Sequence, residues 1–378
     1  MDFNRLSPRA HAVLVPLAAL TLAALFVVEQ SQRVVPSPWH DAMLQAAERS
    51  ARAAGAVKRH RLERGAFVDA VNDPLETALI GQAFTQITTD RGDLDAKLAS
   101  TDPNFAAVVV AMAHELGLAR GDCVAVAMTG SFPALNLSTL AALETLGVAP
   151  VLISSVGASN FGATDPYFTW LDIERIAAEA RVLTTRSVAA SLGGSKDIGR
   201  GLAPKGRTLL REAIARNGIP LLDHTPLEAS IAARMAIYRD GCAPRPVAAY
   251  INVGGGVASL GHALNSELIP IGPSPHMPAR NYPARGTLLR FAADGTPVIQ
   301  LLKIRQLRRD YGLLPLRDDT PPMPGQGAVY GQMRYDLAQT GLATTLLLGL
   351  LIGLYARDRR IHALGQSDPE PPPGGTSS

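Results

Sequence analysis

The sequence predicts an α/β protein with a mostly parallel sheet flanked by helices, tethered by one transmembrane helix near each end. Three observations support this class. The unbroken apolar run at 123–128 is typical of a strand buried on both faces of a parallel sheet, and 247–253 is expected to form another buried strand. Helix-like segments alternate with such runs, which indicates crossover connections. Finally, long stretches without a charged residue occur near both ends of the 378-residue chain.

The two uncharged stretches are each long enough to cross a bilayer, which takes about 20 mostly apolar residues. We expect a first transmembrane helix at 13–29 and a second at 337–356. A cleaved signal peptide is the alternative for the first, but no small-x-small cleavage pattern follows it. A buried core helix is the alternative for the second, but its position ahead of a charged, proline-rich tail favours a membrane span.

The positive charges beside these spans predict an orientation. The flanking arginines are Arg5, Arg9, Arg357, Arg359 and Arg360. Because positive flanks stay in the cytoplasm, we expect residues 1–12 and a disordered tail at 357–378 to be cytoplasmic. Residues 30–335 then form an extracytoplasmic α/β domain on the cell (inner) membrane, in which 30–70 is a helical stalk or a packing helix.

Composition narrows the class of protein further. The formal net charge of +3 is too slight to suggest a nucleic-acid partner, and the 47% hydrophobic content excludes a chain that is disordered throughout. Two cysteines are too few for a small cystine-stapled scaffold. Cys123 and Cys242 could pair if their strands are neighbours, but we expect two buried free thiols.

The helices are predicted by residues that start or stop them: proline near the first residue, acidic residues in the first turn, or glycine just past the end. These signals place helices at 38–64, 104–116, 133–146, 172–180, 207–217 and 226–238. For the last helix we expect Thr225 as the N-cap and Pro226 at the first position. A turn at 72–76 is expected to lead into a further short helix.

The strands are predicted by short apolar runs between the helices, at 123–128, 151–155, 220–222 and 247–253. The first two, with the helix between them, form one βαβ crossover and a parallel pair. Residues 270–283 are rich in proline and glycine and are expected to form a loop. In such folds ligands bind at the carboxyl edge of the sheet, where loops follow the strands.

Ser131 is the sharpest candidate for chemistry, because it lies where the strand 123–128 gives way to the helix 133–146. A serine nucleophile is presented at such a turn, and helix N–H groups could hold an oxyanion there. The G-x-S-x-G spacing is absent, however, and Phe132 and Pro133 are bulky. We therefore favour Ser131 as a helix cap or ligand contact over a nucleophile, with Pro133 starting the helix.

Three glycine-rich turns follow apolar segments, at 154–159, 191–201 and 252–259. Their bare N–H groups and serine hydroxyls could cradle a phosphate or carboxylate, although glycines that only permit tight turns are the alternative. With the turn after 123–128, they supply the candidate ligand-binding residues: Gly130, Ser131, Asn136, Ser154, Ser155, Ser159, Gly193, Gly194, Lys196, Arg200, Asn252, Gly254, Gly255 and Gly256.

Metal and cofactor sites are not expected. No pair of the eight histidines has a spacing such as H-E-x-x-H. Neither the Walker A motif nor a complete G-x-G-x-x-G motif is present, so no nucleotide cofactor is expected.

Several of these motifs together resemble the bacterial poly-gamma-glutamate system protein family. The resemblance covers most of 70–261, and the segments that carry it are 72–81, 100–107, 130–136, 154–159 and 252–259. The family is associated with the ligase and membrane components that make poly-γ-glutamate, a capsule or released polymer. It carries no assigned catalytic residues, so none is transferred to this chain.

The resemblance implies a membrane-anchored accessory component of poly-γ-glutamate synthesis and export. Its partners would be the membrane, the synthase or export subunits and the poly-γ-glutamate chain itself, with no nucleic acid. Residues 30–335 carry a slight excess of Lys and Arg, which suits an anionic partner. The alternative is an extracytoplasmic serine hydrolase or transpeptidase that acts on the polymer through Ser131.

Overall fold

The chain divides into two compact units, and each is described by itself. The structure, a computed structural model, describes residues 8–317 and 319–365. One unit, called the terminal unit here, combines Met1–Val35 with Gln332–Ser378, and the central unit is Pro36–Gly331.

The terminal unit contains the two long apolar helices that the sequence predicts, α1 (Pro8–Gln30) and α13 (Leu337–Gly365). The stretches Val13–Gln30 and Leu337–Arg357 are long and apolar enough to cross a membrane, and neither is buried within the structure. Apolar side chains that remain uncovered to this extent are unfavourable in water. The two helices are therefore compatible with membrane spans.

Helix α13 extends beyond the predicted end of the second span. The sequence predicts a helix at 337–356 and a disordered tail at 357–378, but the helix continues to Gly365. Residues 357–365 include three arginines, which have high helix propensity, and they contain no proline that would stop the helix. The rest of the predicted cytoplasmic ends, 1–7 and 366–378, lies outside the described residues.

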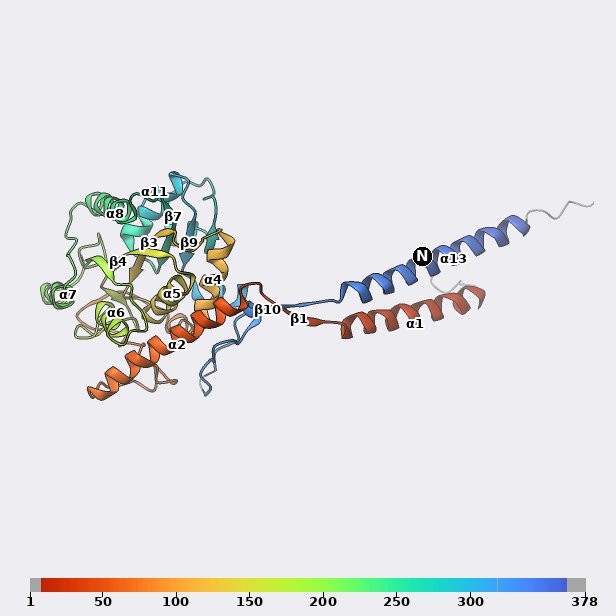
Figure 1. The fold of residues 1–378 in the computed structure, drawn as a ribbon, viewed down its shortest axis with the longest axis horizontal. Coiled ribbons are helices and arrows are strands. Elements are labelled where there is room, and N and C mark those ends of the chain that lie inside the picture. Colours follow the sequence, from red (N-terminus) through yellow and green to blue (C-terminus); the bar gives the residue numbers. More distant parts are fainter. Residues whose placement is uncertain (1–7, 318, 366–378) are drawn as a thin grey trace, which may run out of the picture. The chain divides into compact units, whose positions relative to one another are not determined.

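The central unit is built on a six-stranded sheet in the order β6-β4-β3-β7-β9-β8 (Figure 1). Neighbouring strands are parallel except for β8, which runs antiparallel to β9 at one edge. The mostly parallel α/β class is therefore confirmed. The strands are β3 (Cys123–Thr129), β4 (Ala149–Ser155), β6 (Ser187–Ser191), β7 (Val247–Val253), β8 (Gly272–Ser274) and β9 (Val298–Leu301).

Alternate residues of the central strand β3 enter different hydrophobic cores. Val124, Val126 and Met128 face the larger core, whereas Ala125 and Ala127 face the smaller one. This alternation follows from the two-residue period of a strand, and it requires helices on both faces. Figure 1 shows α8 and α11 on one face of the sheet and α2, α5 and α6 on the other.

The larger core is covered by α2 (His40–Glu63), α4 (Phe105–Glu115), α5 (Pro133–Leu146), α6 (Trp170–Glu179) and α7 (Pro204–Arg216), and the smaller by α8 (Leu227–Cys242), α9 (Val257–Leu260) and α11 (Thr287–Ala293). Of the two forms considered for 30–70, the structure shows a packing helix, since α2 contacts α4 and α5. The buried residues of α2 include Ala46, Ala47 and Ala53, whose small side chains allow the neighbouring helices to approach closely.

The remaining elements are short. They are α3 (Leu94–Ala99), α10 (Asn265–Leu268), α12 (Ile304–Asp310), the 3₁₀ turn at Ala328–Tyr330, and two strand pairs, β1 (Arg33–Pro36) with β10 (Gly331–Arg334) and β2 (Thr88–Asp90) with β5 (Ala158–Ser159). Of these, α3 and the pair of β2 with β5 help to position the functional site.

Cys123 and Cys242 form a disulfide, so the expectation of two free thiols is wrong. Cys123 begins β3 and Cys242 ends α8. Helix α8 packs across β3 and β4, and this contact brings its last residue to the first residue of β3. The pairing depends on this packing, which spans 119 residues of sequence.

The short helix expected after the turn at 72–76 is absent from the structure, which is described throughout this segment. The reason is Asp73, which is fully buried. Its carboxylate accepts hydrogen bonds from the backbone N–H groups of Thr77 and Ala78, at 3.0 and 2.8 Å. These bonds stabilise an irregular loop in which Glu76 and Ala78 have positive φ angles, so the helical ladder cannot form.

Other differences occur at element ends and edges. The predicted strand at 220–222 forms only an isolated bridge from Leu221 to Ala190. Pro226, rather than Thr225, is the N-cap of α8, and no side chain caps this helix. The predicted loop at 270–283 contains the edge strand β8, where proline is tolerated because one side of the strand needs no hydrogen bonds.

Candidate functional site

A cavity of about 530 Å³ opens at the carboxyl edge of the sheet. The last residues of β3 and β4, Thr129 and Ser155, line it, as do Gly255 and Gly256 after β7. Strands β4 and β7 lie on opposite sides of β3, so the order of the strands reverses at β3. The cavity lies at this topological switch point. This is the position at which open α/β sheets bind ligands.

Six of the residues predicted to bind a ligand line this cavity: Ser131, Ser155, Ser159, Gly194, Gly255 and Gly256. They lie at or after the carboxyl ends of four strands of the sheet, β3, β4, β6 and β7. The parallel sheet brings these strand ends to one edge, as the sequence predicts.

Two of the predicted residues, Asn136 and Asn252, do not line the cavity but hold the segments that do. Asn136 is buried on α5 and donates from Nδ2 to the carbonyl of Thr129 at 2.9 Å, which fixes the helix to the end of β3. Asn252 donates to the carbonyl of Gly254 at 2.7 Å and to Gln300 at 2.8 Å. The amide nitrogens of both residues are occupied by these structural contacts, and neither residue lines the cavity.

Close backbone packing explains several of the predicted glycines. A Cβ atom at Gly130 would lie 2.4 Å from the carbonyl oxygen of Val156. Gly193 and Gly254 have φ angles of +74° and +93°, which L side chains rarely adopt. For these three positions the structure supports the alternative that glycine permits a tight turn.

Lys196 and Arg200 do not line the cavity. Their side chains are exposed, and the segment between them is fixed by Asp197, which is buried. Asp197 forms an ion pair with Arg234 at 2.9 Å, and it accepts a hydrogen bond from Ser155 at 3.2 Å. This buried pair attaches the turn 191–201 to the sheet edge below the cavity.

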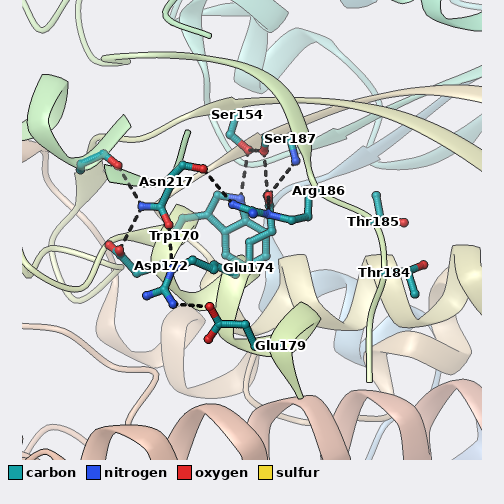
Figure 2. A network of polar contacts seen from close by, with 12 residues as sticks. Ser154, Trp170, Asp172, Glu174, Glu179, Thr184, Thr185, Arg186, Ser187 and Asn217 are labelled. Carbon is teal, nitrogen blue, oxygen red and sulfur yellow. Dashed lines mark hydrogen bonds and ion pairs between the residues drawn. The ribbon is translucent and has the colours of Figure 1, made fainter. Parts of the chain in front are cut away.

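Ser154 belongs to a separate buried network (Figure 2). Its hydroxyl accepts from Nε1 of Trp170 at 3.0 Å and contacts the hydroxyl of Ser187 at 2.7 Å. Ser187 in turn donates to the carboxyl of Glu174 at 2.7 Å. These contacts join β4, β6 and α6, so Ser154 has a structural role away from the cavity.

Lys97 also lines the cavity and is not among the residues predicted from sequence. It lies on α3 and is only 2% exposed. Its Nζ donates to the backbone carbonyl of Ser131 and to Oγ of Ser159, the latter at 2.8 Å, and lies 3.9 Å from the centre of the Phe132 ring. A lysine in a six-residue helix usually faces solvent, and no motif around it indicates otherwise.

Burial lowers the pKa of Lys97 to about 7, and the charge of Asp93 opposes this shift in part. Asp93 caps α3 and pairs with Arg305 at 3.2 Å rather than with the lysine. No Asp or Glu oxygen among residues 8–317 and 319–365 lies within ion-pair distance of Nζ. The ammonium form of Lys97 therefore lacks a carboxylate partner at the wall of a cavity.

Ser131 does not cap α5, so the capping half of the prediction is wrong, whereas its role as a ligand contact stays a prediction. The N-cap is Phe132, without a side-chain hydrogen bond, whereas Pro133 occupies the first turn as predicted. The hydroxyl of Ser131 instead accepts from the backbone N–H of Ser159 at 3.1 Å. The turn after β3 is thus joined to β5, and the second hydroxyl, that of Ser159, faces the lysine.

This arrangement can bind an anion or transfer a proton, since it combines a buried amine with hydroxyls at a cavity wall. A metal centre is not indicated, because the described residues contain no group of three His, Cys, Asp or Glu side chains placed to hold an ion. No family model, curated protein or solved structure matches the chain, so the geometry of the site is the basis for its function.

Proposed function

We propose that this chain is a membrane-anchored accessory component of a poly-γ-glutamate synthesis and export system, and that it binds carboxylates of the polymer at the Lys97 cavity. The observation that carries the proposal is a buried lysine amine without a carboxylate partner. The resemblance of 70–261 to poly-gamma-glutamate system proteins supplies the identity of the polymer.

A carboxylate in the cavity would supply the charge that Lys97 lacks. A buried ammonium is unfavourable until an anion pairs with it, which is why its pKa is lowered. Pairing stabilises the charged form, and the hydroxyls of Ser131 and Ser159 could donate to the same anion. Each residue of poly-γ-glutamate carries one free carboxylate, so the polymer offers the cavity many equivalent ligands.

The membrane anchor and its orientation are part of the proposal. Helices α1 and α13 are long and apolar enough to span, and arginines follow the second apolar stretch. The Cys123–Cys242 disulfide supports an extracytoplasmic central unit, because disulfides persist in oxidising compartments. On this side of the membrane the central unit would encounter an exported polymer.

Isothermal titration of the full-length protein in nanodiscs with a short γ-linked glutamate oligomer tests the proposal. We expect Lys97→Met to weaken binding at least tenfold, and Lys205→Met, at an exposed position of α7, to leave it unchanged. Wild type should also take up protons on binding near pH 7.5, because the carboxylate raises the pKa of Lys97. Equal affinities for wild type and Lys97→Met, or no binding by wild type at low salt, would contradict the proposal.

The alternative, a hydrolase or transpeptidase with Ser131 as nucleophile, has less support. An unactivated serine is a poor nucleophile and needs an adjacent base. Among the described residues, the base nearest to this turn bonds the carbonyl of Ser131 and the hydroxyl of Ser159, not the hydroxyl of Ser131.

A further inference from the structure

We propose that Ser159 and Lys97 form an acyl-transfer pair in which Lys97 is the general base, Ser159 is the nucleophile and the Ser131 hydroxyl stabilises the oxyanion. The substrate class is a carboxamide, and its identification with the γ-amide bond of polyglutamate rests on the proposed function. The pair acts when an amide of the chain lies in the cavity and Lys97 is neutral, whereas a carboxylate paired with the Lys97 ammonium blocks the reaction.

The contacts of Lys97 fit a neutral amine that accepts a proton. Nζ lies 2.8 Å from Oγ of Ser159, within reach for direct proton transfer. A neutral amine has two N–H donors and one lone pair. As an ammonium, Lys97 donates to the carbonyl of Ser131 and to Oγ of Ser159. When it loses one proton, one N–H keeps the bond to Ser131 and the other faces the Phe132 ring, so the lone pair can accept from the Ser159 hydroxyl.

The burial of Lys97 supports this role. Its pKa is lowered to about 7 because the side chain is removed from water, so the neutral amine is populated near neutral pH. The other charged groups that line the cavity are Asp90, Arg91 and Asp93, and Asp93 pairs with Arg305 of α12. None of them forms an ion pair with Lys97 in the part of the chain described.

Ser159 is placed where a substrate can reach it. It is half-buried, lines the cavity and belongs to β5, which pairs with β2. Gly92 lies directly against it: a Cβ at this position would be 3.1 Å from Oγ of Ser159 and 2.4 Å from the carbonyl of Asn160. The missing side chain leaves the hydroxyl uncovered.

Ser131 is placed to stabilise charge on the substrate. Its Oγ already accepts from the N–H of Ser159 at 3.1 Å, and its own proton has no acceptor among the described residues. A hydroxyl that is fixed by an accepted bond and has a proton to donate is suited to a developing oxyanion.

In the reaction, Lys97 takes the proton of Ser159 while Oγ bonds to the carbonyl carbon, and the C=O electron pair moves to the oxygen held by Ser131. The C–N bond then breaks, and the ammonium of Lys97 gives its proton to the leaving amine. Water attacks the resulting ester, Lys97 takes its proton, and the serine recovers a proton as the carboxylic acid leaves. An amine in place of water gives transpeptidation.

A fluorophosphonate probe, which phosphonylates activated serines, tests the pair on full-length protein in nanodiscs with mass spectrometry of the labelled peptide. We expect the label on Ser159 and its loss in Ser159→Ala, Lys97→Met and Lys97→Arg. In Ser131→Ala the label should remain on Ser159 at a rate lower by roughly 100-fold. Ser266→Ala, a serine that bonds only its own turn, is the matched control and should label as wild type does.

The pH profile separates a base from a purely structural lysine. The labelling rate of wild type should rise with pH and level off above about 7, following the pKa of Lys97. Circular dichroism and a thermal melt confirm that each variant is folded. Absence of label in folded wild type, label on another serine, or undiminished labelling of Ser159 in Lys97→Met would each overturn the pair.

The same samples distinguish this inference from the proposed function. Ser159→Ala should bind the γ-linked glutamate oligomer more weakly than wild type, because it loses one hydroxyl donor, but binding should remain measurable because Lys97 is kept. Oligomer binding without any labelling of Ser159 would overturn the acyl-transfer pair alone. Labelling of Ser159 without oligomer binding would support the pair and reject polyglutamate as its ligand.

Discussion

Glu174 provides a test of the structure that does not depend on its function. This carboxyl is 1% exposed on α6, and its two oxygens accept from the backbone N–H and the hydroxyl of Ser187, both at 2.7 Å (Figure 2). Arg186 is nearby, with Nε 3.5 Å from the carboxyl, but this nitrogen makes no hydrogen bond. The perturbation we consider is Glu174→Gln, which keeps the shape and removes the ionisation.

Burial raises the pKa of Glu174 from 4.5 to about 7, although the bonds from Ser187 and the charge of Arg186 oppose this shift. The folded chain therefore retains a proton at pH values where the unfolded chain has lost it. Stability is greatest below pH 4.5 for this group and falls as pH rises towards 7. The pKa difference corresponds to a loss of about 3 kcal/mol by pH 8.

Thermal unfolding followed by tryptophan fluorescence measures this effect, because the indole of Trp170 is buried in the same network. Between pH 5 and pH 8 we expect this group to lower the Tm of wild type by roughly 5 °C. Glu174→Gln should lack that component, while Glu63→Gln, at an exposed position, should follow wild type. Identical pH dependences for wild type and Glu174→Gln would refute the argument.

Three further outcomes are expected. Gly130→Ala should lower stability by about 1–3 kcal/mol in thermal melts, because its Cβ would meet the Val156 carbonyl at 2.4 Å, whereas Gly255→Ala, with open space around it, should not. Asp197→Asn should cost about 3–5 kcal/mol, because it leaves Arg234 buried and unpaired; a loss below 1 kcal/mol would contradict the buried ion pair. Maleimide should label denatured protein at Cys123 only after reduction, and labelling without reductant would contradict the disulfide.

The architecture of the central unit could be predicted where local patterns decide it. The apolar runs that form β3 and β7 bury both faces, and glycine after α5 stops that helix in a left-handed conformation. The shorter strands β6 and β9 were missed. Each has only four or five residues and contains a polar residue, such as Ser187 or Gln300, so its apolar pattern is short and interrupted, and it is identified only by its pairing with a neighbouring strand.

The candidate site was likewise predictable in part: its place in the fold follows from sequence, but the contacts of its side chains do not. A parallel sheet brings the turns after its strands to one edge, so the cavity and its serines and glycines follow from the order of elements along the chain. What each side chain does there depends on contacts between residues far apart in sequence. The hydroxyl of Ser131 binds the N–H of Ser159, 28 residues away, and not the helix that follows it.

By itself, the sequence determined the alternation of strands and helices, the two apolar terminal helices and the edge of the sheet where ligands meet, because these depend on periodicity and on local start and stop signals. Only the tertiary structure decided that Lys97 is buried against Ser159 and that Cys123 bonds to Cys242. Burial and pairing are properties of packed surfaces, and no local pattern records which surfaces will meet.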